Sequence, residues 1–234
     1  MGCDPSLQEF GPGLWLVDGP IVTAAIGFHY PTRMAVIRLS DGGLLVWSPI
    51  ALSAEIRSAV NGLSEVRHLV APNSLHHVFL SEWRLAYPSA RLHAPFGLAE
   101  KRRDLAFDGE LTEQSAVIWR DDLDLVVVRG SWITTEVVFF HRASRTVLFA
   151  DLLQQFPPGW FRGWRALIAR WDLMTADEPS VPRKFRLAFT NRASARAAIE
   201  RILAWPAEKV VMAHGTPVLE DGRAFIRRAF AWLM

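Results

Sequence analysis

Short runs of apolar and β-branched residues, separated by turn residues, recur through the first part of the chain. Residues 14–17 and 34–39 have the composition of buried strands. A turn with two glycines at 41–43 then leads into a further apolar run at 44–47. Glycine-containing turns between two such runs are typical of hairpins, so the pattern predicts that the last two runs pair as a β-hairpin.

A helical pattern follows this hairpin. Ser53 has the position of an N-cap, because apolar residues follow it at helical spacing at Ile56, Val60 and Leu63. Beyond it, the pattern predicts a strand at 66–70, a helix at 79–87, a strand at 91–94 and a helix at 98–105. Strands and helices thus alternate through the first half of the chain.

The second half repeats this order. Strand patterns cover residues 124–128, 136–140, 146–150 and 209–213, and helical patterns cover 160–174, 194–203 and 221–233. Each half contains a strand hairpin followed by a helix and a strand. We expect an α/β (α+β) fold in which two packed sheets are covered by helices, within a single domain spanning residues 1–234.

The composition is that of a globular protein with no bias toward nucleic acid. Half of the 234 residues are hydrophobic and ten are tryptophan, so the chain can bury a large core and is not expected to be disordered. Its 26 Lys and Arg against 24 Asp and Glu leave a net charge of +2, which provides no basic stripe. We therefore expect a small-molecule substrate and no nucleic-acid partner.

The single cysteine, Cys3, excludes an internal disulfide and any cysteine-rich zinc motif, so a metal site has to use histidine and carboxylate ligands. No apolar run approaches the roughly 18 residues that a membrane helix needs, and the N-terminus has no secretory signal pattern. We expect a cytoplasmic protein without a membrane partner. Residues 1–6 match a loose myristoylation pattern, but a match this short is easily accidental.

Polar residues that follow three of the predicted strands are the candidates for chemistry. Asn73, His76 and His77 follow the strand 66–70, Asp151 follows 146–150, and His214 follows 209–213. Ligands gather at the carboxyl ends of strands in α/β folds, so these three places are expected to converge. Imidazoles with one carboxylate can hold one Zn ion, or another divalent ion such as Mn or Fe, and leave a position open for a water.

Each of these residues also has a structural interpretation. Adjacent histidines point in different directions, so only one of His76 and His77 is expected to face the site, and a loop or capping role explains the pair without metal. Asp151 can instead be the N-cap of a helix starting at Leu152. His214 can be a hydrogen-bonded structural histidine at a tight turn.

Strand geometry excludes His141 from the same site. If the two strands that flank its turn pair antiparallel, Asp151 lies opposite Glu136, which leaves His141 about 16 Å away. Three other histidines have no second ligand at a useful spacing and are interpreted as structural: His29, His68 and His93.

Three tryptophans recur at helical spacing in the predicted helix 160–174: Trp160, Trp164 and Trp171. Large aromatic residues at this spacing most often pack a core, so we expect these three to be buried. One of them can alternatively form the wall of a pocket.

Several short motifs together resemble the metallo-β-lactamase fold superfamily. They are PNSLHH at 72–77, YPSA at 87–90, LFAD at 148–151 and VVMAHGTP at 210–217. The first of them makes the chain similar, more narrowly, to the DUF4336 proteins. The resemblance covers nearly the whole chain and implies a four-layer αββα sandwich with metals at the edge between the sheets. Hydrolysis by a metal-bound water is the usual activity of this superfamily.

The chain departs from the superfamily at its metal motifs. The pattern His-x-His-x-Asp-His falls on Asn73, Leu75, His77 and Val78 in one frame, and on Pro72, Ser74, His76 and His77 in the other. The segment Gly130-Ser131-Trp132 lacks the histidine of a Gly-His-Thr motif, and Ser48 replaces an expected aspartate. The resemblance therefore implies a reduced site with Asp151 as the metal-bridging carboxylate, His214 as the late histidine, and His76 or His77 as third ligand.

Two functions remain open from the sequence. The first is a hydrolase with a single metal ion, in which a metal-bound water attacks an ester, amide or phosphoester, Asp151 is catalytic, and Asn73 donates a hydrogen bond to the developing oxyanion. The second is a non-catalytic scaffold that binds a small molecule or a protein without metal. A redox cofactor is a weaker third option, because no glycine-rich nucleotide motif is present. The sequence does not identify the substrate or the oligomeric state.

Overall fold

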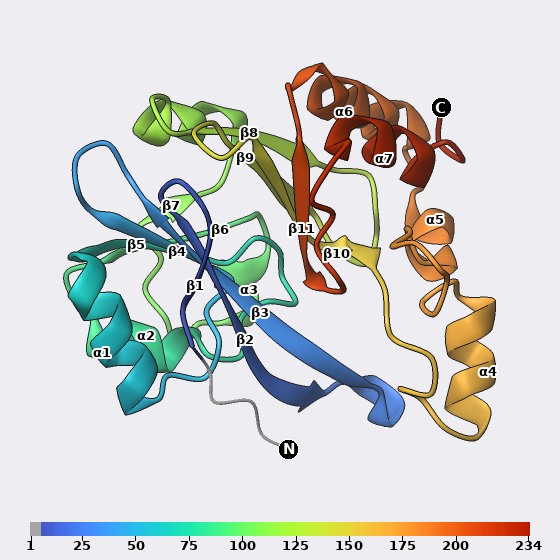
Figure 1. Cartoon of the computed structure of the whole chain (residues 1–234), viewed down its shortest axis with the longest axis horizontal. Helices are drawn as coiled ribbons and strands as arrows, with labels where there is room; N and C mark the ends of the chain where they lie inside the picture. Colours follow the sequence, from blue (N-terminus) through green and yellow to red (C-terminus); the bar gives the residue numbers. More distant parts are fainter. Residues whose placement is uncertain (1–5) are drawn as a thin grey trace.

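The computed structural model describes residues 6–234, which form two β-sheets packed face to face (Figure 1). Cys3 and the other residues of 1–5 lie outside the described part. The first sheet has the order β1-β2-β3-β4-β5-β6-β7, and the second has the order β11-β10-β9-β8. In the first sheet the strands are β1 (Gln8–Gly11), β2 (Leu14–Thr23), β3 (His29–Arg38), β4 (Leu44–Trp47), β5 (Val66–Val70), β6 (Arg91–Ala94) and β7 (Gly109–Glu110). In the second they are β8 (Leu123–Val128), β9 (Glu136–His141), β10 (Thr146–Gln154) and β11 (Lys209–His214).

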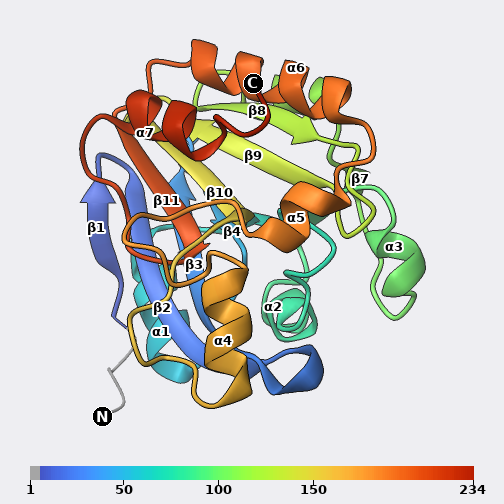
Figure 2. The same ribbon diagram turned by 90° about the vertical axis from the view of Figure 1, so that its right-hand side faces the viewer.

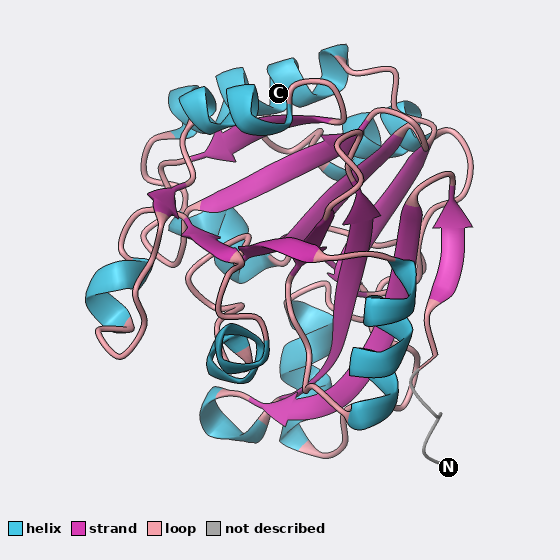
Figure 3. Cartoon of the chain, turned by 90° about the vertical axis from the view of Figure 1, so that its left-hand side faces the viewer, coloured by secondary structure: helices cyan, strands magenta, loops and turns pink. Residues whose placement is uncertain are grey.

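Helices cover the outer face of each sheet, and Figures 2 and 3 show these layers from opposite sides. The helices are η1 (Ala25–Gly27), α1 (Ala54–Leu63), α2 (Leu80–Ala86), α3 (Leu98–Lys101), η2 (Glu113–Trp119), α4 (Trp164–Trp171), α5 (Arg183–Ala188), α6 (Arg192–Ala204) and α7 (Gly222–Ala229). Ser53 caps α1 as expected, since its hydroxyl accepts the backbone N–H of Ile56.

Most of the buried apolar residues form three layers between these elements, and a smaller cluster around Phe28 and Phe156 packs against α4. One layer lies between the first sheet and α1 and α2, and includes Val60 and Trp83. A second fills the space between the two sheets around Phe139. The third joins the second sheet to α6 and α7 through Ile199 and Phe225. The predicted four-layer αββα architecture is therefore confirmed.

Pairing between β9 and β10 confirms the geometry that excluded His141. Thr146 lies opposite His141 in an antiparallel ladder, so Asp151 falls at the end of β10 near Glu136. His141 lies at the other end, where its Nδ1 is 2.7 Å from the hydroxyl of Ser144.

Three helices are shorter than the sequence predicts, and a glycine in the left-handed conformation sets the start of one of them. The predicted helix 160–174 begins only at Trp164, because Gly163 precedes it with φ of 58°. The predicted helix 98–105 ends at Lys101, and the predicted helix 221–233 is confined to Gly222–Ala229. Five elements have no counterpart in the prediction: β1, η1, β7, η2 and α5.

Trp164 and Trp171 do not pack the core, so the expectation for them is wrong. They are 48% and 73% exposed, whereas Trp160 is partly buried against the cluster of Phe28 and Phe156. The side of α4 that faces the protein is formed by small residues such as Ala169. The larger residues of this helix therefore point outward.

The structural interpretation of His68 and His93 is supported by their surroundings. Both are buried, Nδ1 of His68 lies 3.1 Å from Nε2 of His93, and both rings contact Trp119 edge-on. Burial lowers the pKa of each imidazole to about 4, because the charged form loses its hydration.

Among residues 6–234, no helix combines the length and the apolar character needed to cross a bilayer.

This histidine pair predicts a loss of stability in acid. In the unfolded chain both imidazoles bind a proton near pH 6.5, whereas in the folded chain they stay neutral down to about 4. The unfolded state therefore binds more protons between these values, and the free energy of unfolding falls as the pH falls, by up to about 1.4 kcal/mol per pH unit for each histidine. Urea unfolding between pH 7 and pH 5 measures this slope.

The variant His93→Gln isolates the effect, since glutamine keeps a hydrogen-bonding group beside His68 but binds no proton. We expect its pH slope to be smaller by about one proton than that of the parent chain. An identical slope in both proteins would show that His93 titrates normally in the folded state.

Candidate metal centre

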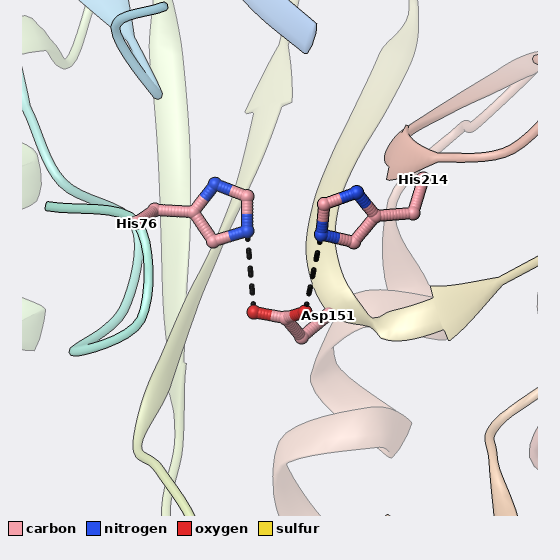
Figure 4. A group of neighbouring side chains, drawn as sticks. All are labelled: His76, Asp151 and His214. Atoms are coloured by element: carbon pink, nitrogen blue, oxygen red, sulfur yellow. Dashed lines mark ion pairs between the residues drawn. The ribbon is translucent and has the colours of Figure 1, made fainter. Parts of the chain in front are cut away.

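Three predicted ligands meet at one edge of the sandwich. His76 lies in the loop after β5, Asp151 lies on β10, and His214 is the last residue of β11 (Figure 4). Nε2 of His76 is 3.2 Å from Oδ2 of Asp151, and Nε2 of His214 is 3.3 Å from Oδ1. One ligand atom from each residue lies within 4.8 Å of the others. The expected convergence of three strand ends thus brings together two imidazoles and one carboxylate.

Asn73 fixes the loop that carries His76. Its side-chain oxygen accepts the backbone N–H groups of Leu75 and His76 at 2.9 and 3.0 Å. Its amide nitrogen donates to Asp151 at 2.8 Å and to Glu136 at 3.2 Å. Because this residue is fully buried and its amide donates to two carboxylates, it connects the loop to β10.

Glu136 holds the backbone on which Asp151 sits. Its buried carboxylate accepts the N–H groups of Ala150, Asp151 and Leu152 at 2.9, 2.8 and 3.1 Å. Burial and the nearby Asp151 charge raise the pKa of Glu136 to about 7, although the N–H donors oppose this shift. With these contacts β10 continues to Gln154, so the alternative that Asp151 caps a helix is wrong.

The hydrogen bond of His214 to the backbone defines its tautomer. Its Nδ1 lies 2.7 Å from the carbonyl oxygen of Pro31. A carbonyl can only accept, so Nδ1 carries the hydrogen. In the neutral ring, Nε2 therefore presents a lone pair toward Asp151, as in a metal-binding histidine.

A hydrogen bond to Ser48 likewise defines the tautomer of His76. Its hydroxyl donates to the carbonyl of Arg33 at 3.0 Å and lies 2.8 Å from Nδ1 of His76. A hydroxyl has one hydrogen, so Ser48 accepts from the imidazole, and His76 also carries its hydrogen on Nδ1. Ser48 has φ of 53°, a left-handed conformation that is uncommon for residues with a side chain.

Two lone pairs and a carboxylate consequently face one another in a buried space, and this arrangement requires positive charge. Protons on the imidazoles are one source, and a metal ion is another. The separations of 3.2 and 3.3 Å, each to a different oxygen of Asp151, are close to the distance of about 3.3 Å between neighbouring ligands of a tetrahedral zinc ion. One donor atom from each of the three residues lies within 4.8 Å of the others. Burial would raise the pKa of Asp151, but the facing imidazoles outweigh it and hold that pKa well below its usual range. The donor set therefore fits a divalent metal.

Gln154 provides an unpaired acceptor beside this centre. Its amide nitrogen donates to Oδ1 of Asp151 at 3.1 Å, which orients the side chain, whereas its buried Oε1 has no hydrogen-bond partner. Buried acceptors without a partner are rare in folded proteins. This oxygen can accept a hydrogen from a water or substrate at the centre.

His77 does not join the ligand set. Its ring and its carbonyl oxygen contact the guanidinium of Arg102, and the Nδ1 to Nη1 distance is 3.2 Å. Burial and the nearby cationic side chains lower the pKa of His77 to about 4. Of the two histidines that the sequence left open, His76 is the one that faces Asp151.

A cavity of about 420 Å³ adjoins the centre, and Asp151, His76 and His214 form part of its wall. Eight of the sixteen other lining residues are apolar, among them Val22, Leu75, Val78, Phe79, Ile133 and Phe185. Lys184 donates to the hydroxyl of Tyr30 at 3.1 Å, and this pair lies on the same wall. Burial raises the pKa of Tyr30, so its hydroxyl stays protonated at neutral pH.

Residues 15–162 match the family described as Domain of unknown function (DUF4336), which is more than half of the chain. The chain belongs to the DUF4336 family. A comparison of this DUF4336 chain with curated proteins found no match.

Solved structures show that the DUF4336 chain has the metallo-β-lactamase fold. The FIM-1 enzyme of Pseudomonas aeruginosa in its mono-zinc form is 11% identical, with a TM-score of 0.62 over 98% of this chain and 96% of that one. A metallo-β-lactamase of Hirschia baltica is 13% identical, with a TM-score of 0.64 over 98% and 97%. The Flv1 flavodiiron core of Synechocystis is 12% identical, with a TM-score of 0.66 over 98% of this chain and 61% of that one. At these identities the likeness concerns the fold alone.

The sequence named the three convergent residues and Asn73, but not the roles of Ser48, Gln154 and Glu136 in orienting them. Ser48 was noted only as the residue replacing an aspartate, and Gln154 gave no signal of its own. The register that placed Glu136 opposite Asp151 could have identified this buried carboxylate as a partner of the site.

Replacing Ser48 by alanine should weaken metal binding. The change removes the acceptor that fixes the tautomer of His76, and losing such a supporting group costs about tenfold to a hundredfold in metal affinity. Titration of the metal-free protein with Zn²⁺ against a competing chelator measures the effect. Ser58→Ala, at an exposed serine of α1, is the matched control. Equal zinc affinity in both variants would rule out this role for Ser48.

Proposed function

We propose that this protein is a metal-dependent hydrolase with one divalent ion, held by His76, Asp151 and His214. The supporting observation is that Ser48 and the Pro31 carbonyl fix both imidazoles with Nε2 toward Asp151. A bound Zn, Mn or Fe ion lowers the pKa of water and makes a nucleophile at neutral pH.

Gln154, Asn73 and Tyr30 have further roles in the proposed reaction. Gln154 lines the cavity and donates to Asp151, and its unpaired Oε1 is the acceptor that we assign to the attacking water. Asn73 is better described as a positioning residue than as the oxyanion donor expected from the sequence, because its amide hydrogens point to carboxylates. Tyr30, with Lys184 behind it, is the alternative donor for negative charge that develops on the substrate.

The cavity indicates the kind of substrate. Its volume of about 420 Å³ is in the range of small-molecule sites, and its apolar lining residues suit a substrate with an apolar portion. An ester, amide or phosphoester next to such a portion is the bond we expect to be cleaved. The cytoplasmic location and the lack of a nucleic-acid partner remain predictions.

A binding scaffold without metal is the second candidate. One observation favours it: distances of 3.2 and 3.3 Å between imidazole nitrogens and carboxylate oxygens also suit hydrogen-bonded ion pairs. In that case both imidazoles are protonated, and the cavity binds its ligand without chemical change.

Removing one metal ligand at a time distinguishes the hydrolase from the metal-free scaffold. We expect Asp151→Asn and His214→Ala, purified without chelators, to lose bound metal, because each removes a donor from a three-residue set. Their rates on a panel of a nitrophenyl ester, an anilide and a phosphodiester should fall by more than about a hundredfold, beyond the loss caused by a supporting residue. Elemental mass spectrometry measures the metal, and colour release measures the rate.

His77→Ala is the matched control for metal content, since it removes a neighbouring imidazole that contacts Arg102 instead of Asp151. It should retain the metal of the parent chain. Equal metal content in all these proteins would contradict the metal site. Bound metal with no activity on any of the three substrates would contradict the hydrolase while leaving the metal site in place, and absence of metal from the parent chain would favour the metal-free scaffold.

A further inference from the structure

The outward face of α4 consists of four large apolar residues. Trp164, Leu167, Ile168 and Trp171 follow one another at intervals of three, one and three, so they share one side of the helix. They are 48%, 71%, 42% and 73% exposed, respectively. The helices of globular proteins usually turn such a stripe toward the core. Here the same pattern faces solvent.

The inward face shows that α4 is nevertheless anchored in the fold. Ala169 is fully buried in a small aromatic cluster with Phe28, Phe156 and Phe161, and Ala166 packs against it. Trp164 also reaches this cluster, with its ring centroid 6.1 Å from that of Phe28, but about half of its side chain stays exposed. The exposed stripe is therefore a surface presented by a fixed helix.

Cationic side chains surround the stripe at both ends. Arg165 lies over the ring of Trp164 at 4.5 Å, and Arg183 lies over the ring of Trp171 at 5.5 Å. Arg170 is exposed on α4 itself. No acidic residue occurs between 156 and 171. The next carboxylate, that of Asp172, is buried 3.5 Å from the ammonium of Lys184.

The hairpin between β2 and β3 extends the surface. Its tip lies beside α4 (Figure 2), where Arg165 donates to the carbonyl of Ile26 at 3.0 Å. Ile26 is 68% exposed, so its side chain adds to the apolar area. The surface therefore combines two separate segments, and we call Ile26, Trp164, Leu167, Ile168 and Trp171 the α4 surface.

We propose that the α4 surface docks on an anionic lipid bilayer, with α4 lying in the plane of the headgroups. Leucine and isoleucine at the centre, tryptophan at both ends and arginines around them match the side chains that settle in the headgroup region. Anionic lipid supplies the negative charge that Arg165, Arg170 and Arg183 lack on this face.

A second copy of the chain is a poorer occupant. A two-fold contact through the α4 surface would bring the same arginines of both copies together without a carboxylate between them. The sequence predicted no membrane partner because no apolar run is long enough to span a bilayer. An in-plane helix needs no such run, so the inference replaces that prediction.

Flotation with lipid vesicles tests the apolar contribution. The full chain should float with vesicles of phosphatidylcholine and phosphatidylglycerol, and less with phosphatidylcholine alone. Leu167→Glu removes an apolar group and adds a charge that the lipid repels, so partitioning should fall by at least about tenfold. Leu85→Glu is the matched control, because Leu85 is a leucine on α2 that is 85% exposed, and it should bind like the parent chain.

Arg170→Gln tests the charge contribution. One cation near an anionic surface is worth a factor of about five in partitioning, and this difference should shrink as salt is added. Arg227→Gln, at an exposed arginine of α7, is the matched control and should not change binding.

Three results would overturn the proposal. The first is no flotation of the parent chain with vesicles that contain phosphatidylglycerol. The second is equal loss of binding in Leu167→Glu and Leu85→Glu. The third, from sedimentation, is a dimer that Leu167→Glu converts to a monomer while no vesicle binding is observed. Matching circular dichroism and thermal unfolding of all variants excludes misfolding, and none of the changes touches His76, Asp151 or His214.

Discussion

Positive charge between two imidazoles and a carboxylate is the condition on which the centre depends. Both imidazole rings are fixed by the hydrogen bonds that they donate, His76 to the hydroxyl of Ser48 and His214 to the carbonyl of Pro31. The amides of Asn73 and Gln154 each donate to one oxygen of Asp151. The remaining lone pairs point at one another in a buried space, where unbalanced negative charge is costly. In the proposed hydrolase a metal ion supplies the positive charge at this centre, whereas in the alternative scaffold two protons supply it.

His76, Asp151 and His214 lie close together because contacts of Arg33 join the edges of the two sheets. Arg33 on β3 pairs with Asp18 at 2.7 Å and donates to the carbonyls of Met212 and Gly215, while its own carbonyl accepts from Ser48. One residue thus ties the first sheet to the turn that follows His214. Gly215 is required at that turn, since a Cβ there would lie 2.9 Å from the sulfur of Met212.

The positions of Asp151 and His214 followed from strand ends, because apolar runs and their termini are local features of a sequence. The choice between His76 and His77 did not, since it depends on a loop fixed by Asn73 through contacts with a distant strand. Ser48 and Gln154 were missed for the same reason. Trp171 shows another limit: helical spacing defines a face, but the packing of Ala169 decides which face is buried.

The inner face of α4 contributes to folding stability, whereas its outer face forms an exposed apolar surface. The helix is held to the core mainly by Ala169 and by the edge of Trp164, so replacing Leu167 or Trp171, which are 71% and 73% exposed, removes little buried area and costs little folding free energy. Substitutions on this outer face can therefore change what the helix presents to solvent while leaving the buried residues around His76, Asp151 and His214 untouched.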